Sequence, residues 1–91
     1  MLFVIPEPLR DLAGSRGEVR VDGNAKSLAD ALALFWGSCP GVRDRILTEK
    51  GEVRPHVNIF VDGESIRFAA GLATPVHARS EIVILPALSG G

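Results

Sequence analysis

Short apolar runs separated by polar turns run along the whole chain. Residues 2–5 and 82–85 are each four apolar residues in a row, which is typical of strands buried in the middle of a sheet. Residues 18–22 alternate polar and apolar side chains and therefore predict a half-buried strand. The two N-terminal runs are separated by a short proline- and glycine-containing segment, so we expect them to pair as antiparallel strands.

A helical pattern follows these two strands. Ser27 is a suitable N-cap, and Asp30 lies in the first turn that it would cap. We expect the helix to end at Gly37 and a second, short helix to occupy residues 40–47. The apolar stripe of the first helix, which would face the sheet, consists of Leu28, Ala31, Leu32, Phe35 and Trp36.

The remaining elements are strands. Residues 57–61 predict a strand that turns at Asp62-Gly63 toward a shorter strand at 65–67, and Pro86 is expected to end the last strand. The resulting order of elements predicts an α+β fold. In it, a mixed sheet of four to five strands packs on one main helix, with a short helix beside it. Residues 1–86 would form this single domain, and residues 87–91 would follow it as a C-terminal tail.

Composition narrows the classes of function. The 91-residue chain suits one small domain, and its 46% hydrophobic residues are sufficient for a core. A net charge of −1 argues against nucleic acid or an anionic membrane as the partner, and no apolar run approaches the roughly 20 residues of a membrane span. The start lacks the pattern of a signal peptide, and a single cysteine excludes a disulfide framework. We expect a cytoplasmic protein.

The last residues form the most informative segment. The final strand is followed by Pro86, Ala87, Leu88 and Ser89, and the chain ends in Gly90-Gly91. Glycine has no Cβ, so such an end is narrow and can enter a slot that other residues would block. The terminal carboxyl group is ionised near neutral pH. The pattern predicts a folded body that presents a carboxylate on a thin tail, although glycines can also occur at a terminus without any function.

Residues 84–91 resemble the closing motif of the ubiquitin-like sulfur carriers, the MoaD/ThiS superfamily. Residues 54–63, the tripeptide Ile66-Arg67-Phe68 and residues 71–75 resemble internal motifs of its molybdopterin-synthase-like branch. The motif near residues 68–75 is most similar to that of the cysteine-pathway carrier and of carriers in pathways of sulfur-containing metabolites. Leu88-Ser89 stands where valine–alanine is commoner. The resemblance spans nearly the whole chain and implies the β-grasp fold.

The resemblance also implies a chemistry for the tail. A ubiquitin-activating-type enzyme would use ATP and Mg²⁺ to adenylate the Gly91 carboxylate, and a sulfur donor would then displace AMP to leave a thiocarboxylate. Gly90 would keep the approach to Gly91 unhindered. The chain would be a co-substrate rather than an enzyme and would bind no cofactor itself. A sulfur-accepting synthase would be a downstream partner, and a metalloprotease that trims the tail a further one.

Two other functions remain open. A ubiquitin-like modifier would be joined through Gly91 to lysines of target proteins, using the same activated tail. A plain interaction module would have an inert Gly-Gly end. The final sulfur acceptor is equally open, since a molybdopterin precursor, an activated serine, a thiazole and a thiosugar would each suit a carrier of this kind.

Strand alternation predicts a docking surface beside the tail. If Phe3, Ile5, Ile82 and Ile84 face the helix, then Val4, Val83 and Leu85 face outward. Depending on the strand register, Phe60 would join them, because its side chain points to the opposite side of the sheet from those of Val57, Ile59 and Val61. An apolar patch on a monomer commonly marks a partner surface. We expect truncation of Phe60 or Leu85 to weaken binding to the activating enzyme. The expected partner-binding residues are Phe60, Val83, Leu85, Pro86, Ala87, Leu88 and Ser89.

Other reactive residues are weaker candidates. Cys39 could carry a persulfide, but a free cysteine is more often a small buried hydrophobe, and no basic residue adjoins it in sequence. His56 and His77 are too far apart in sequence for a compact metal motif. We therefore expect a structural Cys39 and no metal site.

Overall fold

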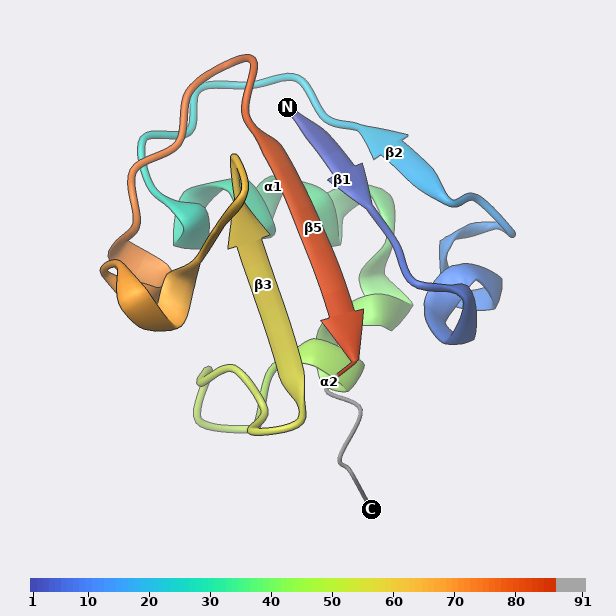
Figure 1. Ribbon diagram of the computed structural model, residues 1–91. Coiled ribbons are helices and arrows are strands. Elements are labelled where there is room, and N and C mark those ends of the chain that lie inside the picture. The colour runs from blue at the N-terminus through green and yellow to red at the C-terminus, as the bar shows by residue number, and fades with distance from the viewer. Residues whose placement is uncertain (87–91) are drawn as a thin grey trace.

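The computed structural model describes residues 1–86 and contains one mixed five-stranded sheet (Figure 1). The strand order is β2-β1-β5-β3-β4, and β5 is central, parallel to β1 and antiparallel to β3. The expected antiparallel pairing of β1 with β2 is confirmed. The strands are β1 (Leu2–Val4), β2 (Glu18–Arg20), β3 (Val57–Val61), β4 (Glu64–Ser65) and β5 (Glu81–Pro86).

Helix α1 (Leu28–Ser38) covers one face of this sheet and lies behind it in Figure 1. Its predicted cap is confirmed, because the Ser27 hydroxyl accepts a hydrogen bond from the Asp30 backbone N–H at 3.2 Å. The prediction that Gly37 ends the helix is wrong. A glycine inside a helix costs only about 1 kcal/mol relative to alanine, and the helix continues for one more residue, to Ser38.

The connections contain short helical segments. A 3₁₀ helix, η1 (Glu7–Ala13), follows β1, and the expected short helix after α1 is divided into η2 (Pro40–Val42) and α2 (Arg43–Ile46). The expected strand at 65–67 is largely replaced by η3 (Ile66–Phe68), since the Ser65 hydroxyl accepts the Arg67 N–H and turns the backbone away from the ladder. A further 3₁₀ turn, η4 (Gly71–Ala73), follows.

Strand β5 is longer than predicted at both ends. It begins at Glu81 and includes Pro86, which pairs with Val57 as the last residue of the strand. Proline is tolerated there because a terminal strand position need not donate to the ladder. The start of β5 is anchored by Asp62, whose carboxylate accepts hydrogen bonds from the Glu81 N–H at 2.9 Å and the Ser80 hydroxyl at 3.0 Å.

The core lies between the sheet and α1. Phe3, Ile5, Ile82 and Ile84 are fully buried, as the strand alternation predicts. The Phe3 ring stacks on Phe35 of the helix with a centroid separation of 4.3 Å. A mixed sheet with its last strand at the centre and one helix across it is the β-grasp arrangement, so the expected fold is confirmed.

Candidate functional site

The site is organised around the end of β5. This strand is hydrogen-bonded on both sides, to β1 and to β3, and its last residue is paired with the first residue of β3. A central strand, which is hydrogen-bonded to a neighbour on each side, is among the most stable parts of a sheet. Whatever follows Pro86 therefore starts from a fixed point on the body.

An apolar row crosses the sheet on the side away from α1. The register places Val83 opposite Val4 on one side and opposite Phe60 on the other. These three residues are half-buried, whereas Leu85, two residues further along β5, is 42% exposed. We call Val4, Phe60, Val83 and Leu85 the outer face.

The structure thus brings together three of the predicted partner-binding residues, Phe60, Val83 and Leu85. Pro86 is the last residue of the strand. Ala87, Leu88, Ser89, Gly90 and Gly91 lie outside the described residues, and their predicted roles remain predictions.

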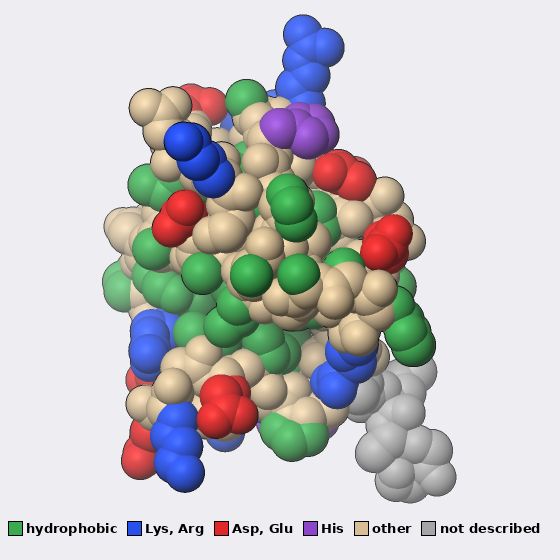
Figure 2. All heavy atoms as spheres, turned by 90° about the vertical axis from the view of Figure 1, so that its left-hand side faces the viewer, with side chains coloured by type: hydrophobic (Ala, Val, Ile, Leu, Met, Phe, Trp, Pro, Cys, Tyr) green, Lys and Arg blue, Asp and Glu red, His purple; other side chains and the backbone are tan. Residues whose placement is uncertain are grey.

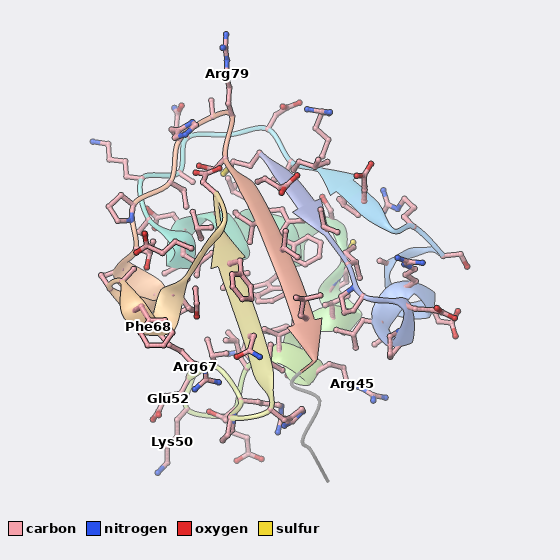
Figure 3. The ribbon with its side chains drawn as sticks, viewed as in Figure 1. Arg45, Lys50, Glu52, Arg67, Phe68 and Arg79 are labelled. Atoms are coloured by element: carbon pink, nitrogen blue, oxygen red, sulfur yellow. The ribbon has the colours of Figure 1, made fainter. Side chains whose placement is uncertain are left out.

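A small hollow lies next to Leu85, with a volume of about 180 Å³. Arg45 and His56 contribute to its lining, together with apolar side chains from η1 and β3. The Arg45 side chain lies near the end of β5 (Figure 3). Neither of the two ion pairs within residues 1–86, Arg43–Asp44 and His77–Asp62, involves Arg45. The end of β5 therefore combines apolar surface with an arginine that has no ion-pair partner among the described residues.

Cys39 is not part of this site. Its side chain is buried at 2% exposure, in agreement with a structural role. The fold does supply the basic neighbour that the sequence lacks, because an Arg16 guanidinium nitrogen lies 3.5 Å from Sγ. Burial nevertheless denies the thiol access to a partner.

The two histidines also stay apart from the tail chemistry. His56 is exposed beside Arg45, and His77 lies 3.6 Å from the Asp62 carboxylate at the opposite end of β5. Within the part of the chain that the structure describes, no three metal-binding side chains come together. The same residues contain no helix long and apolar enough to cross a membrane.

Sequence reasoning missed one prominent residue, Phe68. Its side chain is 86% exposed at the end of η3. The residue belongs to the motif Ile66-Arg67-Phe68, for which the sequence predicts no binding or catalytic role. Its exposure could have been suspected from the sequence, because Phe68 is a single aromatic residue that follows Arg67 and precedes a run of small residues, outside any alternating strand pattern.

The fold and a family match define the class. A mixed sheet with its last strand at the centre and one helix across it is the architecture of ubiquitin-like proteins. The ThiS family matches residues 3–91, which is nearly the entire chain. The protein belongs to the ThiS family.

Similar proteins agree with this assignment. The chain is 37% identical to small archaeal modifier protein 1 of Haloferax volcanii, with 91% of each chain covered. It is 32% identical to sulfur carrier protein CysO of Mycobacterium tuberculosis, covering 96% of this chain and 94% of the relative. In the crystal structure of the Amycolatopsis orientalis BexX/CysO complex, one chain superposes with a TM-score of 0.87. That match has 27% identity and covers 99% of this chain and 98% of the other.

Proposed function

We propose that this protein is a sulfur carrier whose Gly91 carboxylate is converted to a thiocarboxylate. The observation that carries the proposal is a ThiS-family body whose central strand is followed in the sequence, after three residues, by Gly90-Gly91. Relatives named as sulfur carriers, matched over nearly their whole length, support it. The chain contributes the reacting group and is a co-substrate of its partner enzymes.

The chemistry requires activation because a carboxylate is a poor electrophile. A terminal oxygen of Gly91 attacks the α-phosphorus of ATP, and pyrophosphate leaves. A hydrosulfide equivalent then attacks the carbonyl carbon, the bond to the AMP oxygen breaks, and the thiocarboxylate remains. One difficult substitution is divided into two easier ones. ATP and Mg²⁺ belong to the activating enzyme, and the carrier binds no cofactor in this scheme.

The body has a separate task, which is to bring the tail to that enzyme. A narrow tail alone gives poor positioning, so the outer face supplies the docking energy. Leu85 is exposed at the root of the tail, and the positively charged Arg45 lies near the end of the same strand. Binding of this surface would direct residues 87–91 into the active site of the partner. A sulfur-accepting synthase would later recognise the charged carrier, and a metalloprotease would trim any precursor extension.

A second candidate function is that of a ubiquitin-like modifier. It is favoured by the 37% identity to small archaeal modifier protein 1. The modifier would form an isopeptide bond between Gly91 and a lysine of a target, after the same adenylation step. Adducts of higher mass that carry this chain in a cell extract would indicate the modifier, and a pure carrier gives none.

Adenylation tests the step that both functions share. The protein is incubated with the activating enzyme of its own organism, ATP and Mg²⁺, and pyrophosphate release is measured. We expect release that depends on the protein and that is abolished when Gly90 and Gly91 are deleted. The deletion variant serves as its own folding control, because a chain terminus contributes little stability and its thermal unfolding should match the wild type. Pyrophosphate release from the deletion variant at the wild-type rate would contradict the proposal.

A further inference from the structure

Phe68 is the most exposed large hydrophobic side chain in residues 1–86. It is 86% exposed, and the only others in this class are Leu85 at 42% and Leu12 at 38%. Burying a phenylalanine side chain is favourable, and this contribution is largely absent in the isolated protein. A large apolar side chain that the fold holds in water is informative, because it commonly marks a contact with a partner.

The segment that carries Phe68, residues 65–70, is held in place by specific hydrogen bonds. Arg67 donates from Nε to the Asn58 side-chain oxygen at 3.2 Å, and from Nη2 to the carbonyls of Pro55 and Val57 at 3.0 Å each. The Ser65 hydroxyl caps the turn by accepting the Arg67 N–H.

A second anchor fixes the far end of the same segment. The hydroxyl of the buried Thr74 accepts the Ala70 N–H at 3.2 Å and donates to the Gly71 carbonyl at 2.6 Å. The backbone around Phe68 is therefore ordered before any partner binds. Preorganisation of this kind lowers the entropy cost of association.

This segment adjoins the outer face. Arg67 reaches Asn58, and Asn58 is the cross-strand partner of Leu85 in the sheet register. Phe68 and Arg67 lie next to each other beside β3 (Figure 3). One partner could therefore contact Leu85 at the root of the tail and Phe68 at the edge of the sheet.

The surroundings of Phe68 indicate the chemistry of that partner. The third guanidinium nitrogen of Arg67, Nη1, makes no hydrogen bond within residues 1–86, and no ion pair among these residues includes Arg67. Arg67 also lines a hollow of about 230 Å³ with Val53, Ile66 and Leu72. Figure 2 shows this edge of the molecule, where hydrophobic side chains gather across the middle and charged groups lie around them.

We propose that Phe68 is the main anchor by which the activating enzyme binds this protein. The inference rests on the proposed function and names the surface that the enzyme recognises. The enzyme would present an apolar pocket for the Phe68 ring, with a carboxylate at its rim to pair with Arg67. Aromatic and arginine side chains dominate the binding energy of protein interfaces. We assign the surface to this enzyme because both candidate functions require it.

Titration calorimetry with the activating enzyme, without ATP, tests the proposal. Phe68→Ala should raise Kd at least tenfold, whereas the control Leu12→Ala, at an exposed hydrophobic residue of η1 outside the outer face and the Phe68 segment, should leave Kd within about twofold of the wild type. Phe68→Ala should unfold at the wild-type temperature, since Phe68 contributes almost no buried area. Leu12 is only 38% exposed, so circular dichroism is used to confirm that Leu12→Ala is folded before its Kd is compared. Arg67→Gln should weaken binding and make it less sensitive to salt, because exposed charge pairs are screened by salt.

The outcomes separate this inference from the proposed function. Equal Kd values for the wild type and Phe68→Ala overturn it, as does a wild-type protein that does not bind the enzyme. A Phe68→Ala variant that binds the activating enzyme normally but loses affinity for the sulfur-accepting partner would overturn the assignment to the activating enzyme. Adenylation, assayed in parallel, decides the proposed function independently of these affinities.

Discussion

The two faces of β5 show how one strand serves two purposes. Ile82 and Ile84 face α1 and are at most 1% exposed, whereas Val83 and Leu85 alternate with them and face away from the helix, with Leu85 42% exposed. All four are branched aliphatic residues in one uninterrupted run. The hydrophobicity of these residues therefore does not show which of them are buried. Burial is decided by the packing of α1 on one face of the sheet.

The difference separates stability from binding. The inner residues are buried within the folded chain itself, so their contribution appears as resistance to unfolding. The outer residues stay partly in water until a partner covers them, so their contribution would appear as affinity. Substitutions on the two faces should therefore change different measured quantities.

The largest contrast is expected between neighbouring residues of β5. Ile84→Ala should lower the free energy of unfolding by about 2–5 kcal/mol, the usual range for truncating a buried isoleucine. Leu85→Ala should cost about 1 kcal/mol or less in stability, but it should raise Kd for the activating enzyme. Urea unfolding and titration calorimetry on both variants measure the two effects. Equal loss of stability in both variants would show that the two faces do not differ as described.

Phe60→Ala should give a smaller effect on binding. The ring is half-buried between Val83 and Ser65 in the register, so only part of it is available to a partner. We expect Kd to rise about tenfold, which corresponds to about 1.4 kcal/mol, while circular dichroism shows a folded protein. An unchanged Kd in both Phe60→Ala and Leu85→Ala would place the docking surface outside the outer face.

Cys39→Ala should have the smallest effect. The side chain is small, so its loss should lower the free energy of unfolding by about 1–2 kcal/mol. Sulfur transfer should be retained, because the reacting atom belongs to Gly91 in our account. A fully folded Cys39→Ala protein that transfers no sulfur would assign the sulfur to the buried thiol instead.

The elements of the fold were predictable where the pattern is local. The Ser27 cap, the apolar stripe of α1 and the outward facing of Phe60 and Leu85 follow from short-range rules of spacing, and the structure confirms them. The resemblance of residues 84–91 led to the family, and its prediction of the ThiS group is confirmed over residues 3–91.

The failures share a physical cause, which is contact between residues distant in sequence. The turn at 66–68 is fixed by Arg67 binding to Pro55, Val57 and Asn58, and no short window of sequence contains these partners. The exposure of Phe68 follows from that turn and was missed for the same reason. Gly37 was given too much weight, since a glycine weakens a helix without having to end it.

Intact-mass spectrometry tests the central claim most directly. The protein is incubated with the activating enzyme, ATP, Mg²⁺ and a sulfide source, and the mass of the whole chain is measured. We predict a gain equal to the difference between one sulfur atom and one oxygen atom, located by fragmentation at Gly91 and absent from the variant that lacks Gly90 and Gly91. An unchanged mass under conditions in which the enzyme charges a known carrier, or a sulfur located on Cys39, would contradict the account.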